Sequence, residues 1–207
     1  MSTVDEYLSS LNTQHHIIGK MEFEKNTSIK FFCPVIDTSV AKFLYVLMRA
    51  LKPKKVLELG TSIGYSATVM SLAISDFNGK ITTIEKDKVV AKAAEENFKR
   101  YNVDKNISLL NDDVFSVLPK LNEKYDVIFL DLYNGLYLDV MEGCIRLLKK
   151  GGILIADDTL FPVTKNKAFF LESNKKMDEF NKKLSERKDM DSILLPFDDG
   201  ITLAVKI

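Results

Sequence analysis

Apolar and polar positions follow one another along the chain in two patterns. Short apolar runs predict strands buried on both faces of a sheet, and longer stretches with apolar residues three or four positions apart predict amphipathic helices. The strands expected are 55–59, 80–85, 107–110, 125–130, 153–156, 192–195 and 201–205. The helices expected are 36–51, 65–74, 88–101, 114–121, 135–149 and 169–187.

The first five strands alternate with helices, which predicts a parallel sheet with helices on both faces. The last two strands are separated only by 196–200. Because that link is too short for a parallel crossover, we expect an antiparallel hairpin there. The fold class expected is therefore α/β, with a seven-stranded, mostly parallel sheet that ends in this hairpin. We expect a single domain over 1–207, with an N-terminal helical segment at 1–34 and a core at 35–207.

The charge balance and the cysteine content are those of an ordinary soluble protein, and neither indicates a particular partner. The 29 basic and 29 acidic residues cancel, so no bulk charge favours nucleic acid or membrane, although a local basic patch is compatible with this balance. Two cysteines, Cys33 and Cys144, are too few for a disulfide framework and lack metal-type spacing. The N-terminus has no signal-peptide pattern, and no apolar run reaches the length of a membrane span. We expect a soluble, cytoplasmic protein with no membrane partner.

The first strand is followed by a turn that contains Gly60, Ser62 and Gly64. Ligands of open α/β sheets bind beyond the carboxyl ends of the strands, where glycines let the backbone approach closely. The spacing is Gly-x-x-x-Gly, not the pattern that binds a pyrophosphate. It favours a cofactor without phosphates; the alternative is a tight strand-to-helix turn with no ligand.

Polar residues after the next strands suit the parts of one particular cofactor. Glu85, 25 positions beyond Gly60, can accept hydrogen bonds from both ribose hydroxyls, although a lone acid at a strand end is often merely solvated. Asp113 and Val114 can contact an adenine ring, and Ser66 in the first helical turn suits an amino-acid carboxylate. A nucleoside at one end and an amino acid at the other describe S-adenosylmethionine.

Several of these segments resemble the catechol and caffeoyl-CoA O-methyltransferase family. The first motif is Val56 to Ala67, which reads V-L-E-L-G-T-S-I-G-Y-S-A, and the closing motif is Leu195 to Ile201, which reads L-P-F-D-D-G-I. The resemblance covers about 34–207 and is strongest to the short bacterial branch, which includes a tRNA 5-hydroxyuridine methyltransferase. It implies a Rossmann-like methyltransferase fold and an S-adenosylmethionine-dependent O-methyltransferase. The positions it implies for cofactor contact are Ile36, Ser66, Glu85, Asp113, Val114 and Asp131, with Glu58 and Gly60 lining the pocket.

The resemblance also implies a catalytic metal site. Asp131 and Asp157 match two ligands of the family's divalent cation, and Asp158 stands where the family usually has Asn. Three carboxylates at neighbouring strand ends suit a hard cation, Mg²⁺ first and Mn²⁺ or Ca²⁺ otherwise. The alternative is that Asp157 and Asp158 only cap a loop. Asn134 replaces a family Lys that serves as a general base or its helper, and an amide cannot take a proton.

The first function expected is methyl transfer to a hydroxyl of a small aromatic or similar molecule. One alternative is the same chemistry on a hydroxylated uridine in tRNA, and another is a cofactor-binding protein that has lost catalysis. The apolar positions of 169–187, Phe169 among them, are expected to form a packing face. The other side of this helix is basic and is either a solvated surface or an RNA-binding one. His15 and His16 are expected to be exposed, and the resemblance makes a homodimer an open alternative.

Overall fold

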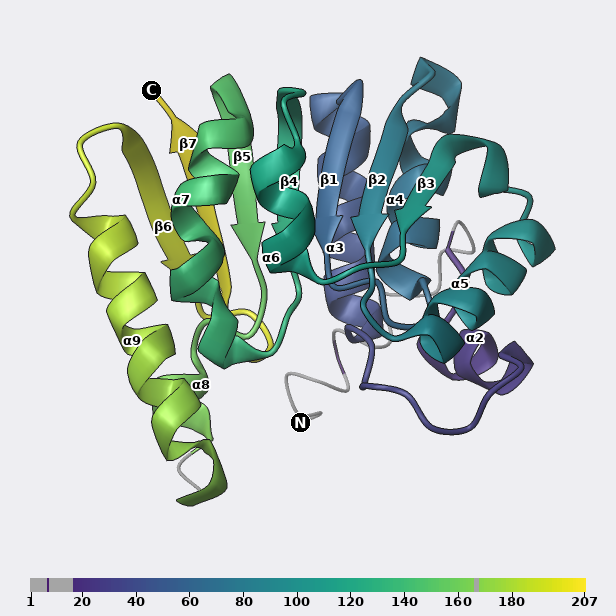
Figure 1. Cartoon of the computed structure of the whole chain (residues 1–207), viewed down its shortest axis with the longest axis horizontal. Coiled ribbons are helices and arrows are strands. Elements are labelled where there is room, and N and C mark those ends of the chain that lie inside the picture. Colours follow the sequence, from purple (N-terminus) through teal and green to yellow (C-terminus); the bar gives the residue numbers. More distant parts are fainter. Residues whose placement is uncertain (1–6, 8–16, 166–167) are drawn as a thin grey trace.

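The structure is a computed structural model that describes Tyr7, residues 17–165 and residues 168–207. Within these residues, seven strands form one sheet in the order β3-β2-β1-β4-β5-β7-β6 (Figure 1). The strands are β1 (Lys55–Leu59), β2 (Lys80–Ile84), β3 (Ile107–Leu110), β4 (Tyr125–Leu130), β5 (Leu148–Ala156), β6 (Met190–Leu195) and β7 (Ile201–Lys206). Neighbours among β1–β5 pair in parallel, and β7 pairs antiparallel with both β5 and β6. The expected fold class is confirmed, including the C-terminal hairpin.

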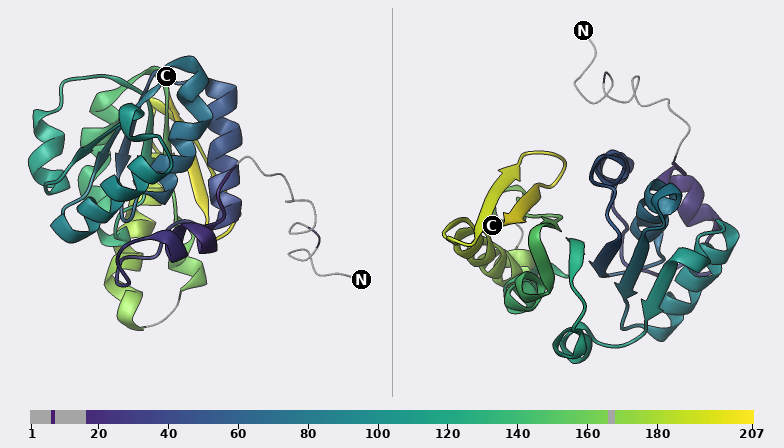
Figure 2. Two further views of the ribbon diagram at one scale, coloured as in Figure 1. Left: turned by 90° about the vertical axis from the view of Figure 1, so that its right-hand side faces the viewer. Right: turned by 90° about the horizontal axis from the view of Figure 1, so that it is seen from above.

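Helices cover both faces of this sheet (Figure 2). The α-helices of the described residues are α2 (Lys20–Asn26), α3 (Thr38–Leu51), α4 (Tyr65–Ile74), α5 (Lys88–Arg100), α6 (Val114–Val117), α7 (Tyr137–Leu147), α8 (Phe161–Thr164) and α9 (Leu171–Ser185). Short 3₁₀ helices lie at Ser75–Phe77, Asp104–Asn106, Leu118–Lys120, Asn134–Leu136 and Ala168–Phe170. Helices α3, α4 and α5 pack on one face, and α6, α7 and α9 pack on the other.

The strands supply both halves of the core because successive side chains point to opposite faces. In β1, Val56 belongs to the cluster under α3–α5 and Leu57 belongs to the cluster under α6, α7 and α9. Both side chains are fully buried. A strand that is apolar on both faces is typical of a parallel sheet between helices, which is why the short apolar runs predicted these strands well.

The junction between α7 and β5 differs from the expectation. We expected a helix to continue through 149, but α7 ends at Leu147 and β5 begins at Leu148. Tyr125 pairs with Leu148 whereas Val127 pairs with Ile153, so residues 149–152 bulge from the sheet. Gly151, with a φ of 74°, allows this irregular path, which a helix-like spacing of apolar residues could not reveal.

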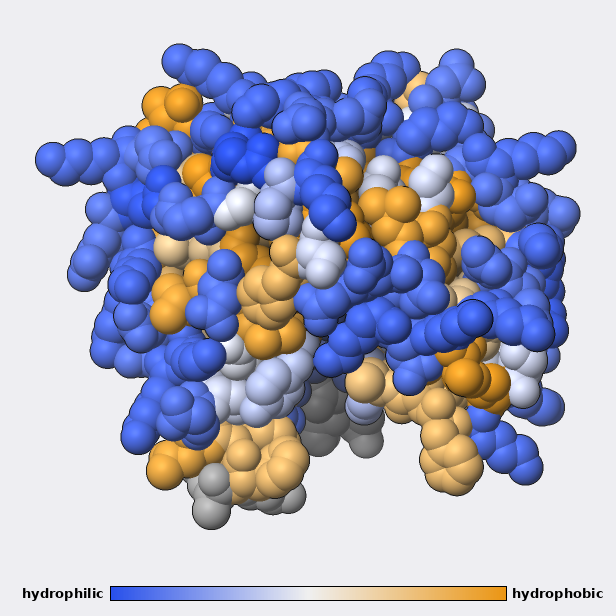
Figure 3. Space-filling model, viewed as in Figure 1, coloured by the Kyte–Doolittle hydropathy of each residue, from blue (hydrophilic) through white to orange (hydrophobic). Residues whose placement is uncertain are grey.

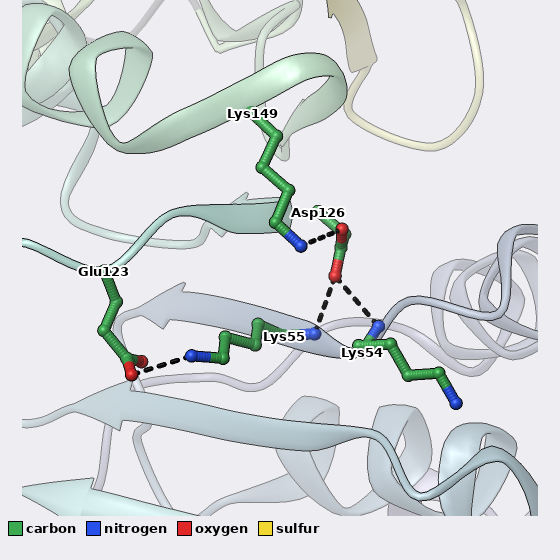
Figure 4. Close-up of polar contacts among 5 residues, drawn as sticks. All are labelled: Lys54, Lys55, Glu123, Asp126 and Lys149. Carbon is green, nitrogen blue, oxygen red and sulfur yellow. Dashed lines mark hydrogen bonds and ion pairs between the residues drawn. The ribbon is translucent and has the colours of Figure 1, made fainter.

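A single carboxylate joins this bulge to the rest of the sheet (Figure 4). Asp126 Oδ1 lies 2.6 Å from Lys149 Nζ, while its Oδ2 accepts hydrogen bonds from the backbone N–H groups of Lys54 at 2.9 Å and Lys55 at 2.8 Å. These bonds hold the pKa of Asp126 below its ordinary value despite partial burial. Asp126 thereby aligns the amino ends of β1, β4 and β5, far from the carboxyl ends that carry the candidate site.

Helix α9 also departs in part from its expected packing. Met177, Phe180 and Leu184 are buried as expected, but Phe169 is 82% exposed because it lies in a 3₁₀ turn before the helix begins. On the outer face, Lys182 pairs with Asp178 and Lys183 pairs with Glu179 within the helix, and two further basic residues pair with acids of α7. Among the described residues, no helix is both long and apolar enough to cross a membrane.

Candidate active site

The candidate residues gather at one edge of the sheet, the lower edge in Figure 1. Parallel strands bring their carboxyl ends to the same edge, and the strand order reverses between β1 and β4, where a crevice forms in such folds. Each candidate lies at or just beyond a strand end or helix start of this edge: Glu58, Gly60, Ser62, Gly64, Ser66, Glu85, Asp113, Val114, Asp131, Asp157 and Asp158, with Ile36 buried just before α3. His15 and His16 lie outside the described residues.

The glycine turn between β1 and α4 is packed too tightly for any other residue at its two ends. Gly60 has a φ of 99°, and a Cβ there would lie 1.9 Å from the backbone oxygen of Asp131. Gly64 has a φ of 86°, and its Cβ would lie 2.4 Å from the ring of Phe98. The turn therefore presses against the β4 end and α5, which fixes its distance from the acidic residues.

Ser62 connects this turn to two other parts of the site. It adopts a left-handed backbone with a φ of 46°, and its N–H donates to Glu85 Oε2 at 3.0 Å. Its hydroxyl donates to the backbone oxygen of Cys33 at 2.9 Å. The segment before α3 is thus held against the turn, and Tyr65 adds a second bond by donating from its hydroxyl to the oxygen of Ile18 at 2.7 Å. No sequence pattern pointed to these two contacts.

Glu85 is half-buried and keeps the capacity to bind a diol. Its Oε2 accepts from Ser62 and its Oε1 accepts from the N–H of Asp87 at 2.9 Å. An ionised carboxylate has about four acceptor positions, so each oxygen retains one for a further donor. Its orientation is fixed by backbone groups before any ligand arrives.

Asp113 and Val114 lie where β3 passes into α6. Asp113 is the N-cap of α6, and its Oδ1 accepts from the N–H of Phe115 at 2.8 Å. Val114 is buried, with 6% of its surface exposed. The helix cap alone accounts for an acid at position 113, while its second oxygen stays available for a ligand.

Glu58 is the most deeply buried acid of the site. It is 0% exposed, its Oε2 accepts from the hydroxyl of Thr83 at 2.5 Å, and its Oε1 has no hydrogen-bond partner. Burial raises its pKa from 4.5 to about 7, although Ser66 and Thr83 favour the charged form and Glu85 opposes it. A buried oxygen without a donor is costly, so this atom marks a place where a ligand could supply one.

Glu58 should make the cofactor-free protein less stable as the pH rises. The folded state holds this proton more tightly than the unfolded chain does, because its pKa is raised from 4.5 to about 7. The free energy of unfolding should therefore fall between those values, by at most about 3 kcal/mol from this group. Glu58→Gln should remove that part of the fall in urea unfolding measured from about pH 4 to about pH 8. Parallel profiles for the two proteins would contradict the assignment.

The acids beyond β4 and β5 are buried together and raise one another's pKa values, and the cations described near them offset this only in part. Burial, then Asp157 and Asp158, raise the pKa of Asp131 well above its ordinary value. Burial and then Asp158 raise the pKa of Asp157 to about 8, and burial, Asp199 and Asp198 raise that of Asp158 to about 7. Lys165 lowers the pKa of Asp158 but is paired with Asp199 at 2.9 Å.

Asn134 is a buried side chain that contacts the loop after β5. It is 6% exposed, and its Nδ2 donates to the backbone oxygen of Asp158 at 3.5 Å, a long bond. Asn181 of α9 donates to the oxygen of the next residue, Thr159, at 2.7 Å. Two asparagines therefore hold the loop that carries Asp158, whose φ is 58°. No sequence pattern indicated the part played by Asn181.

Comparison with known proteins identifies the family. An O-methyltransferase family model matches residues 10–207. The chain belongs to the O-methyltransferase family. This confirms the resemblance to class I, S-adenosylmethionine-dependent enzymes. Catechol O-methyltransferase of Niastella koreensis is 30% identical over 164 residues, 76% of this chain and 73% of that protein. Caffeoyl-CoA O-methyltransferase of Stellaria longipes is 29% identical over 178 residues, 80% of this chain and 73% of that protein. The solved O-methyltransferase of Bacillus cereus in complex with SAH has a TM-score of 0.83 at 19% identity, covering 99% of this chain and 97% of that one.

The site of this O-methyltransferase fits a cofactor with a ribose and an amino-acid end. Glu85 has free acceptor positions for a diol, and Glu58 Oε1 lacks a donor beside the glycine turn. The donor chemistry also suits a hard cation, because Asp131, Asp157 and Asp158 offer oxygens in an excess of negative charge. Among the described residues, no three His, Cys, Asp or Glu side chains are arranged to hold a metal ion together.

Proposed function

We propose that this O-methyltransferase transfers the methyl group of S-adenosylmethionine to a hydroxyl oxygen of a small aromatic molecule, with a divalent cation bound by Asp131, Asp157 and Asp158. The observation that carries the proposal is the juxtaposition, at one sheet edge, of an oriented Glu85 and a buried group of three aspartates. The first element suits the ribose of the cofactor, and the second suits the cation.

Each group has a separate task in this proposal. Glu85 binds the ribose hydroxyls, Asp113 and Val114 bind the adenine, and Ser66 and Glu58 face the amino-acid end. The three aspartates hold the cation, Mg²⁺ first, and Asn134 fixes the carbonyl side of Asp158. A bound cation lowers the pKa of a coordinated hydroxyl and fixes its direction, which offsets the missing Lys at position 134.

Exposed apolar side chains on the segments that follow β4 and β5 support an aromatic acceptor. Tyr133, two residues beyond Asp131, is 58% exposed, and Val163 and Phe169 are 66% and 82% exposed. Figure 3 shows apolar side chains gathered at the lower end of the molecule, beneath α8 and α9. Such a surface favours a flat apolar ring. Two relatives are named for aromatic acceptors, catechol and caffeoyl-CoA, which agrees with this acceptor class.

Transfer of an isotope-labelled methyl group tests the proposal directly. The protein would be incubated with labelled S-adenosylmethionine and a panel of catechols, or with tRNA from cells that lack the 5-hydroxyuridine methyltransferase, with and without a chelator. We expect label on a catechol and its loss when the chelator is present. Label on tRNA alone would replace the acceptor by the hydroxylated uridine. Tight cofactor binding with no transfer would indicate a protein that has lost catalysis.

A further inference from the structure

Two buried hydroxyl groups form a series of hydrogen bonds that ends at Glu58. Glu58 and Thr83 are register partners in β1 and β2, so their side chains share one face of the sheet. Thr83 Oγ1 lies 2.5 Å from Glu58 Oε2 and 2.6 Å from Thr61 Oγ1. Glu58 and Thr83 are 0% exposed and Thr61 is 1% exposed, so water does not compete for these bonds.

The direction of each hydrogen bond in this series is determined when Glu58 is ionised. An ionised carboxylate only accepts, so the single proton of the Thr83 hydroxyl points to Glu58 Oε2. Thr83 Oγ1 is then free to accept, and the hydroxyl of Thr61 donates to it. Thr61 is held in turn by its own N–H, which donates to the oxygen of Ile84 at 3.2 Å. Two short bonds in series thus fix one oxygen of the carboxylate.

The other oxygen, Glu58 Oε1, is left without a donor. Ser66 lies near the carboxylate and favours its charged form, but it makes no hydrogen bond of normal geometry to Oε1. Leaving a buried acceptor unpaired costs about 1–3 kcal/mol, and more for a charged group. Ser66 offsets that cost only in part, and a cationic donor from a ligand would offset the rest.

We propose that Thr83, supported by Thr61, is a positioning residue that turns Glu58 Oε1 toward the amino group of the cofactor. This inference rests on the proposed function, since it assumes that the amino-acid end of S-adenosylmethionine or its product lies beside the glycine turn. The hydroxyl chain holds one oxygen so that the other stays free for the ammonium. Without Thr83, the carboxylate loses its fixed orientation although the fold stays intact.

Binding of two ligands separates this role from a merely structural one. S-adenosylhomocysteine carries the amino-acid end, and 5′-methylthioadenosine lacks it but keeps the same nucleoside. In calorimetric titrations, Thr83→Val should weaken S-adenosylhomocysteine roughly tenfold or more, the effect of one lost bond to a charged group. Its affinity for 5′-methylthioadenosine should stay within about twofold, because no contact to the nucleoside changes. Thr83→Ser keeps the hydroxyl and should behave as the unsubstituted protein.

Three further variants complete the test. Thr68→Val is the matched control, because the buried hydroxyl of Thr68 donates to Gly64 O at 2.7 Å and does not join the Glu58 chain; both affinities should persist. In a Glu58→Gln background, Thr83→Val should cause no further loss. If Thr83→Val does not fold, Thr61→Val provides the same comparison with a smaller loss of S-adenosylhomocysteine affinity.

Four results would count against the inference or its basis. Equal losses for both ligands, or no loss for either, would overturn the positioning role of Thr83. An undiminished effect of Thr83→Val in the Glu58→Gln background would also overturn it, because the two groups would then act independently. An unsubstituted protein that binds neither ligand would instead refute the proposed function itself.

Discussion

Asp157→Ala should lower kcat by about a thousandfold or more while the affinity for S-adenosylhomocysteine stays within about threefold. Asp157 is 5% exposed and lies directly beyond β5, where the sheet edge fixes its position. Its carboxylate is one of the oxygens proposed to hold the cation that activates the acceptor hydroxyl. The residues proposed for the nucleoside lie instead beyond β2 and β3. The substitution should therefore lower kcat without a comparable loss of cofactor affinity.

The comparison for this variant is Asp199→Ala. Asp199 adds to the same field and raises the pKa of Asp158, but its carboxylate pairs with Lys165 at 2.9 Å and is not a proposed ligand. We expect a loss of kcat below about tenfold there, the scale of a partly exposed ion pair. Single-turnover kinetics and calorimetry measure the two quantities. Full activity in Asp157→Ala, or equal losses in both variants, would refute the role given to Asp157.

Gly60→Ala should destabilise the fold by about 3 kcal/mol or more and weaken cofactor binding strongly. The added Cβ would meet the backbone oxygen of Asp131 at 1.9 Å, and a φ of 99° is strained for any L side chain. The atoms that the Cβ would meet first belong to the backbone of Asp131 and not to a flexible side chain, so the turn or the end of β4 must move. Either movement displaces Asp131 relative to Glu58.

Gly151→Ala separates the steric clash from the backbone conformation. Gly151 also has a positive φ, 74°, but a Cβ there would meet nothing within 4 Å. It should cost only about 1–2 kcal/mol, the strain of a left-handed residue, and leave cofactor affinity unchanged. Urea unfolding and calorimetry of both variants test this difference. A Gly60→Ala protein as stable as Gly151→Ala would contradict the packing described for the turn.

The hydrophobic pattern predicted the fold well because both faces of this sheet are buried. In β1 and β4 every position after the first or second is apolar or enclosed, so strand bounds coincide with the apolar runs. The start of β5 was missed because Lys149 to Gly152 form a bulge held by Asp126, a residue more than twenty positions away. Local spacing carries no information about such a partner.

The site was predictable to the extent that parallel strands bring their ends together. Asp131 and Asp157 could be placed side by side because β4 and β5 are neighbours, and the resemblance supplied their roles. The contacts of Thr83 and Asn181 could not be foreseen, because they depend on register and on how α9 crosses the sheet edge. Phe169 was misplaced because helical spacing extended beyond the real start of α9.

A crystal structure with S-adenosylhomocysteine and Mn²⁺ tests the central claim most directly, since Mn²⁺ can be located by its anomalous scattering. The account predicts the ribose hydroxyls on Glu85, the amino group at Glu58 Oε1, and the metal among Asp131, Asp157 and Asp158. A nucleoside bound away from the carboxyl edge of β1 and β2, or a metal held by other residues, would contradict it.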